Sequence, residues 1–128
     1  MLKLRRVRTL AHVALIAMTF LGSSAIVSAD QWFDSYGRLT RNDELAHFSN
    51  FAVYLRDHPE MIGYIALCNG PNDLNSVLMR DKRRAVNFIV SQFKIRRSRF
   101  KIINYGRCGE TMTILQPWDK STTPPKFF

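Results

Sequence analysis

The sequence predicts an α+β fold: a βαβαββ two-layer sandwich with two helices packed on one face of a mixed four-stranded sheet. Residues 62–90 carry the first observation, since they read as a buried strand, a polar loop and an amphipathic helix, which is half of a βαβ unit. Another strand and helix precede this unit, and two more strands follow it. Strands that alternate with helices favour helices packed on one mixed sheet.

The first strand is predicted over residues 30–37, where Trp32, Phe33 and Tyr36 give β character and Gly37 ends the run. A helix follows, and acceptors and negative charge in its first turn suit the exposed amides there. Pro59 ends this helix near residue 58. Its apolar face repeats at steps of three and four residues, at Leu45, Phe48, Ala52 and Leu55.

The central strand is predicted over residues 61–68 and the second helix over residues 76–93. Two further strands are expected at residues 99–105 and 111–117, separated by a glycine-containing turn. The inward-facing positions of these elements define the expected core between helices and sheet: Phe48, Ala52, Leu55, Ile65, Ala85, Ile89 and Ile102.

Residues 1–29 have the three parts of a secretory signal peptide: a cationic start, an apolar run at residues 10–21 and a small-residue exit at Val27, Ser28 and Ala29. We expect cleavage after Ala29 and a periplasmic or secreted protein, the alternative being an uncleaved anchor helix. The remaining chain has no apolar run long enough to cross a membrane, and its net charge is +5. It is predicted to form one domain over residues 30–118 and a flexible tail over residues 119–128.

Both cysteines, Cys68 and Cys108, lie in the exported part of the chain. Two cysteines in an oxidising compartment usually pair, so we expect a disulfide bond, with two free buried thiols as the alternative. Parallel strands two and three would bring both cysteines to the same edge of the sheet. Neither cysteine has a partner at CxxC spacing, which disfavours a redox or zinc site.

No constellation for general acid-base or nucleophilic catalysis is apparent in the sequence. His47 and His58 lack the spacing of a metal pair on one helix face, and no phosphate-binding glycine loop occurs. The sequence therefore disfavours an enzyme, and it predicts neither a cofactor nor a metal site.

Residues 33–117 resemble the OmpA-like peptidoglycan-associated domain, a fold with the same βαβαββ order. The helix at residues 84–90, the stretch at residues 94–99 and the turn at residues 106–110 carry the likeness. The family reads there Arg-Ala-x-x-Val-x-x-Tyr-Leu, then Gly-Ile-x-x-x-Arg, then a Gly-x-Gly-Glu-like turn. The opening at residues 33–37 is similar to that of divergent small secreted relatives. The resemblance implies a non-catalytic module of the cell envelope.

In that family an Asp and an Arg clamp the diaminopimelate of the peptidoglycan stem. The resemblance puts the Arg on Arg84 and, without gaps, the Asp on Asn69, which keeps an acceptor but loses the charge. A gapped alignment offers Asp73 instead. Arg80 raises the local positive potential, and Arg84 is expected on the first turns of its helix, facing residues 69–73. Peptidoglycan binding is therefore expected to be weak or lost.

An alternative is a binder of an anionic envelope polymer or of lipid headgroups. Basic residues crowd the second helix at Arg80, Lys82, Arg83 and Arg84, and they alternate on the following strand at Arg97, Arg99 and Lys101. The plainer interpretation is that these are solvated faces that keep a small domain soluble. Nucleic acid is disfavoured, because no aromatic residues interleave with the basic ones and the protein is expected to be exported. The oligomeric state is left open.

Overall fold

A computed structural model of the protein describes residues 32–128, and the predicted signal peptide lies outside them. The βαβαββ order is confirmed. A 3-10 turn, Arg97–Arg99, precedes the third strand, and no helix within residues 32–128 is long and apolar enough to cross a membrane. The elements are β1 Asp34–Tyr36, α1 Arg41–Asp57, β2 Met61–Asn69, α2 Asn75–Phe93, β3 Phe100–Arg107 and β4 Met112–Asp119.

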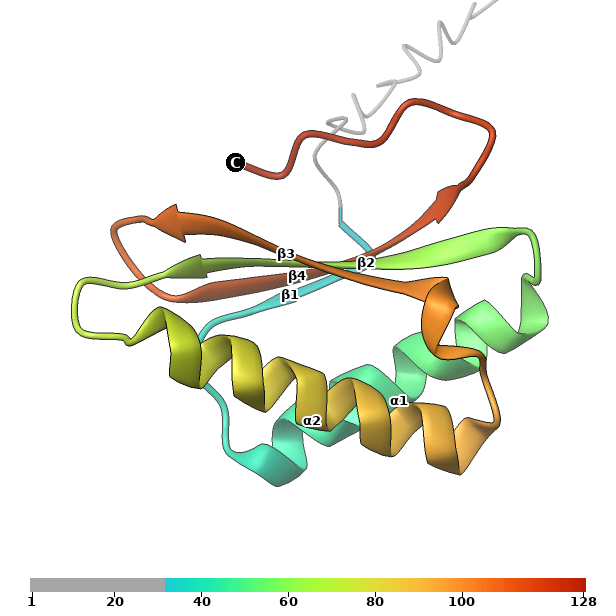
Figure 1. Cartoon of the computed structure of the whole chain (residues 1–128), viewed down its shortest axis with the longest axis horizontal. Coiled ribbons are helices and arrows are strands. Elements are labelled where there is room, and N and C mark those ends of the chain that lie inside the picture. Colours follow the sequence, from blue (N-terminus) through green and yellow to red (C-terminus); the bar gives the residue numbers. More distant parts are fainter. Residues whose placement is uncertain (1–31) are drawn as a thin grey trace, which may run out of the picture.

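The four strands form one mixed sheet in the order β1-β4-β2-β3. β2 and β3 are parallel, while β4 lies antiparallel between β1 and β2. Both helices cover one face of this sheet, as predicted (Figure 1). The register brings the ends of β1, β2 and β3 and the start of β4 to one edge. We call the connections there, at residues 37–40, 70–74 and 108–111, the loop edge.

The predicted core is confirmed. Six of its seven residues are buried in one cluster between helices and sheet, and Ile102 packs against that cluster half-buried. Gly63 lets α1 approach β2 closely, because a Cβ atom there would lie 2.7 Å from Leu55 Cδ1 and 2.9 Å from Phe51 Cε1. At the end of α2, Lys94 has a φ of 52°, in the left-handed region where glycine is the most common residue at the ends of helices.

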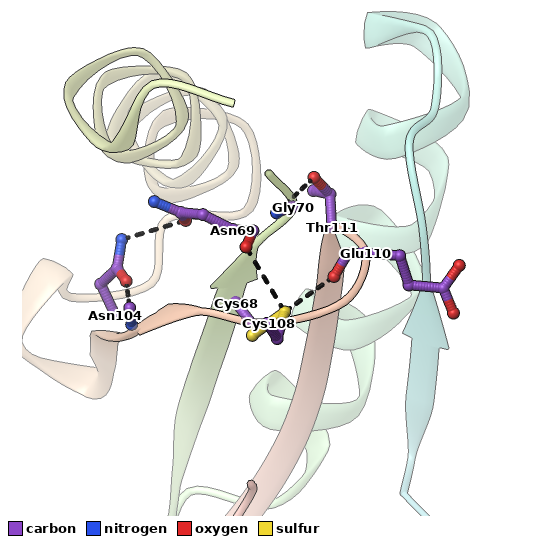
Figure 2. The surroundings of a disulfide bond; sticks show 8 residues. Cys68, Asn69, Gly70, Asn104, Cys108, Glu110 and Thr111 are labelled. Atoms are coloured by element: carbon purple, nitrogen blue, oxygen red, sulfur yellow. Dashed lines mark hydrogen bonds between the residues drawn. A yellow bond between two sulfur atoms is a disulfide. The ribbon is translucent and has the colours of Figure 1, made fainter. Parts of the chain in front are cut away.

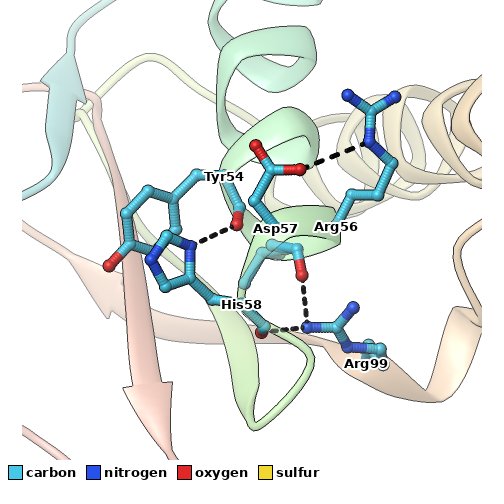
Figure 3. A network of polar contacts seen from close by, with 6 residues as sticks. Tyr54, Arg56, Asp57, His58 and Arg99 are labelled. Carbon is cyan, nitrogen blue, oxygen red and sulfur yellow. Dashed lines mark hydrogen bonds and ion pairs between the residues drawn. The ribbon is translucent and has the colours of Figure 1, made fainter.

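The Arg99 side chain closes the C-terminal end of α1 (Figure 3). Its Nη2 donates to the carbonyl oxygens of Leu55, His58 and Met61 at 2.7–2.8 Å. Leu55 O and His58 O also accept backbone hydrogen bonds, from His58 N at 3.3 Å and from Met61 N at 3.0 Å. The arginine therefore adds a charged donor to carbonyls at the end of the helix and caps it from a distant part of the chain. The prediction that Arg97, Arg99 and Lys101 alternate on one strand face was wrong, because residues 97–99 form a 3-10 turn and the strand begins only at Phe100.

The opposite face of the sheet carries a second apolar cluster, formed by Ile62, Tyr64, Ala66, Ile114 and Phe127. The segment predicted to be a flexible tail lies across this face (Figure 1), and its flexibility stays a prediction. β4 ends at Asp119. Asp119 Oδ1 accepts a hydrogen bond from Ser121 N at 2.8 Å, and Asp119 O accepts one from Thr122 N at 3.1 Å. This turn directs the chain back over the sheet. We call residues 120–128 the strap.

Candidate functional site at the loop edge

The loop edge holds an open pocket of about 440 Å³, whose walls come from all three connections. Within it Arg38, from the β1–α1 connection, forms an ion pair with Asp73, from the β2–α2 connection. The Asp73 side chain is 8% exposed, whereas that of Arg38 is 68% exposed, so the guanidinium lies over the carboxylate. The full lining is Gly37, Arg38, Gly70, Pro71, Asn72, Asp73, Gly109, Glu110 and Thr111.

The predicted disulfide between Cys68 and Cys108 is present and holds this edge together (Figure 2). The two Cα atoms are 5.8 Å apart, which suits the bond. Beside it Cys108 N donates to Asn69 O at 2.8 Å, and Gly70 N donates to Thr111 Oγ1 at 3.0 Å. The end of β2 is thus fastened to the connection between β3 and β4, which fixes the floor of the pocket.

The Asn69 side chain is turned away from this pocket (Figure 2). The residue is 3% exposed, and its Oδ1 accepts a hydrogen bond from Asn104 Nδ2 at 3.3 Å. Asn104 also donates to Asn75 Oδ1, at the start of α2, and accepts from Gly106 N at 2.7 Å. Asn69 therefore belongs to a network of amides that joins β2, β3 and α2.

Arg84 lines a different pocket, of about 270 Å³, between the first turns of α1 and the middle of α2. Its neighbours there include Arg41, Glu44 and Asp81. α2 begins at Asn75, so a rise of 1.5 Å per residue carries Arg84 about 13 Å along the axis from the loop edge. The expectation that Arg84 lies on the first turns of its helix was wrong, and it does not line the pocket that contains Asp73.

Arg80 is exposed and faces its sequence neighbour, with Nε 3.5 Å from Asp81 Oδ1. Of the four residues expected to form the ligand site, Asp73 lies in the loop-edge pocket, Arg84 lies in the pocket between the helices, Arg80 faces solvent and Asn69 is buried in the amide network. The fold thus distributes the expected set over separate places.

Lys82 is a residue whose role the sequence interpretation missed. Its side chain is 7% exposed, its Nζ lies 2.7 Å from Glu44 Oε2, and the same ammonium lies 5.2 Å from the centroid of the Tyr36 ring. Lys82 is therefore not part of a basic surface, and the pair joins α1 to α2. A signal was available, because Lys82 shares the helical spacing of Leu78, Ala85 and Ile89.

Tyr36 lies beside this pair, at the end of β1. Burial raises the pKa of its phenol far above the usual value, and the nearby Glu44 carboxylate raises it further. On the solvent side, His47 Nδ1 lies 2.5 Å from Asp34 Oδ2, and the His47 ring lies 4.7 Å from that of Tyr36. These groups fix the position of β1 against α1, and we assign them a structural role.

Comparisons with known proteins add no assignment: no family model matches the chain, and no curated protein matches it either. Among residues 32–128, no group of three His, Cys, Asp or Glu side chains is placed to hold a metal ion. The loop-edge pocket, with the Arg38–Asp73 ion pair inside it, is the candidate site.

Proposed function

We propose that the protein is an exported, non-catalytic OmpA-like module of the cell envelope whose diaminopimelate site is altered, so that peptidoglycan binding is weak or lost. The proposal rests on the family resemblance and on the βαβαββ sandwich, which has the fold that the resemblance implies.

The position of Asn69 carries the argument for an altered site. A clamp for diaminopimelate needs a carboxylate that receives the ammonium and a guanidinium that binds a carboxylate of the same ligand. At the position of the first group, this chain has a buried neutral amide that is hydrogen-bonded to Asn104. A lost charge-assisted hydrogen bond costs about 1.5 to 3 kcal/mol, or roughly ten- to a hundredfold in affinity.

The Arg38–Asp73 pair offers a different combination of charges at the same edge of the sheet. A zwitterionic ligand would have to separate this pair before it could bind both groups. That competition lowers the affinity further, because each charge already has a partner. Asp73 is thus a poor substitute for the missing family carboxylate.

Calorimetry with a diaminopimelate-containing stem peptide tests the proposal. We expect negligible heat for the parent and for Asn69→Asp as well, because residue 69 is 3% exposed and turned away from the loop-edge pocket, so that a carboxylate there is not accessible to the ligand. Arg84→Ala should not change the parent, and Arg83→Ala is its matched control, because Arg83 is exposed on the same helix and lines neither pocket described above. Tight binding by the parent that Arg84→Ala abolishes would contradict the proposal.

The alternative of a binder of anionic polymer or lipid headgroups finds less support. Of the seven basic residues on which it was based, Lys82 is buried against Glu44 and Arg99 is used to cap α1. Binding of the protein to purified cell-wall sacculi, measured at low and high salt, distinguishes the two candidates. Salt-sensitive binding would favour the alternative, since exposed charges are screened by salt.

A further inference from the structure

The strap and the second face of the sheet line an open pocket of about 460 Å³, separate from the loop edge. Its floor is formed by Tyr64 of β2 and Trp118 of β4, and its outer wall includes Thr122 and Pro124 of the strap. A pocket of this volume is within the range of small-molecule sites, which combine apolar walls with a few polar groups. The segment that forms the outer wall is the one that the sequence had suggested would be a flexible tail.

Two lysines lie at this pocket. Lys101 of β3 is paired in register with Tyr64 of β2, and its Nζ lies 5.9 Å from the centroid of the Tyr64 ring. Lys120, the first residue of the strap, also lines the pocket. Each ammonium is a compact charge with rotatable donors, which suits a carboxylate that approaches over an aromatic floor. The pocket thus joins aromatic surface to positive charge.

The hydrogen-bonding groups of the lining favour a sugar over a plain hydrophobic anion. Ser98 and Thr122 bring hydroxyl groups, and the pocket also contains Asp119. Asp119 Oδ1 accepts both bonds from Ser121, at 2.8 Å each, which leaves Oδ2 for a sugar hydroxyl. A carboxylate in the lining also repels a doubly charged phosphate more than a singly charged carboxylate. The negative face of an aromatic ring attracts the C–H edges of a pyranose.

Phe127 holds the strap over the pocket. It is 6% exposed, and its ring centroid lies 5.1 Å from that of Trp32, 5.8 Å from Tyr64 and 6.0 Å from Tyr105. Tyr64 therefore packs against Phe127 and also lines the pocket. The rest of the strap is largely exposed, so the outer wall depends on this one side chain.

We propose that the pocket under the strap binds a carboxylated sugar unit of an acidic glycan, with the half-buried Trp118 as the stacking surface and Lys101 and Lys120 as the partners of the carboxylate. Tyr64, which is 4% exposed, supports this surface from below. This site lies on the face of the sheet opposite the helices and is independent of the diaminopimelate site. The strap acts as its lid, and Phe127 keeps the lid closed.

Tryptophan fluorescence gives a direct test. The chain has two tryptophans, so Trp32→Phe leaves Trp118 as the reporter and keeps an aromatic ring against Phe127. The probe is a trigalacturonic acid, and its fully methyl-esterified form is the matched neutral ligand. We expect a saturable change with the acid and at least tenfold weaker binding of the ester. Inorganic phosphate is tested as a further ligand, and we expect it neither to bind nor to compete with the trigalacturonic acid.

Variants separate the site from general surface charge. Lys101→Gln and Lys120→Gln should each weaken binding about tenfold, which is the loss of one charge-assisted hydrogen bond. Lys126→Gln is the control, because Lys126 is exposed on the strap and does not line the pocket, and it should change affinity less than twofold. Phe127→Ala should weaken binding by opening the lid, and Phe128→Ala, at a largely exposed side chain, should not.

Three results would overturn the proposal. One is the absence of saturable binding of the acid, and another is equal binding of the acid and its ester. The third is an equal loss in Lys101→Gln and Lys126→Gln, which would show that the whole basic surface attracts the glycan. Melting curves of all variants, measured alongside, ensure that each affinity refers to folded protein.

Discussion

The two faces of the sheet are covered in different ways. On one face, α1 and α2 bury a large cluster in which Phe48, Phe51, Leu55 and Ile89 are fully inaccessible. On the other face, the strap contributes one buried side chain, Phe127, while its neighbours are mostly exposed. Burial of apolar surface is the main favourable term in folding, so the helix side should determine stability. The strap side is the one that can open at low cost, as a binding face requires.

The largest effect should come from the helix side. Leu55→Ala or Ile89→Ala is expected to cost about 2 to 5 kcal/mol, because each leaves a cavity in a fully buried position. Val53→Ala is the control on α1, since Val53 is 36% exposed. Urea unfolding measures the difference. If the core variants unfolded like the control, the assignment of stability to this face would be wrong.

The cap at the end of α1 sharpens the comparison on the same side. Arg99→Ala removes charge-assisted bonds to the carbonyls of Leu55, His58 and Met61 and should cost about 1.5 to 3 kcal/mol. Arg97→Ala is the matched control, because Arg97 makes a single bond at 3.2 Å, to Phe100 O. Equal losses in chemical unfolding would show that the cap contributes no more than the neighbouring arginine.

Tyr36 makes the helix side sensitive to alkali. Its folded pKa is raised above the ordinary value of 10.0, so the neutral phenol stabilises the fold fully below pH 10 and this contribution is lost as the pH rises above it. Above pH 10, the free energy of unfolding should fall by about 1.4 kcal/mol for each pH unit until the folded-state pKa is reached. Denaturant unfolding between pH 9 and pH 12 measures the slope. Tyr36→Phe should reduce it, and an unchanged slope would exclude Tyr36 as the cause.

The strap should respond far more weakly. Phe127→Ala removes a buried apolar side chain that contributes about 1.5 to 3 kcal/mol to the free energy of unfolding. Because the released strap regains backbone freedom, we expect a net loss of stability of about 1 kcal/mol. Amide exchange should rise in residues 120–128 and stay unchanged in α1 and α2. A loss as large as that of Leu55→Ala would make the two faces equivalent and contradict the comparison.

The smallest effect concerns the turn that starts the strap. Hydrogen bonds from the Ser121 backbone and side chain lower the pKa of Asp119 below 3.8, so the carboxylate holds the turn above that pH and releases it as the pH falls through the lower folded value. NMR titration of the Asp119 and Ser121 signals measures this pKa. We expect no change in melting temperature, and a pKa at or above 3.8 would contradict the hydrogen-bonded turn.

The sequence alone determined the fold and its core. The spacing of apolar residues predicted α1 and α2, and short apolar runs predicted β2, β3 and β4, each to within two residues. β1, Asp34–Tyr36, is shorter than the strand predicted over residues 30–37, of which residues 30 and 31 lie outside the described part of the chain. It also predicted the bond between Cys68 and Cys108, because parallel β2 and β3 bring both to one edge. These features depend on local periodicity and on topology, which a sequence records directly.

Only the tertiary structure decided how the polar side chains are used. Lys82 and Arg99 count as surface charges in a sequence, but packing pairs one with Glu44 and sets the other against carbonyls of residues 55–61. Asn69 turns to Asn104, and Arg38 is the partner of Asp73. Charged and amide side chains carry no period that fixes their partners. Their partners come from segments far apart in the chain, and so they are set by the fold that the apolar residues have already built.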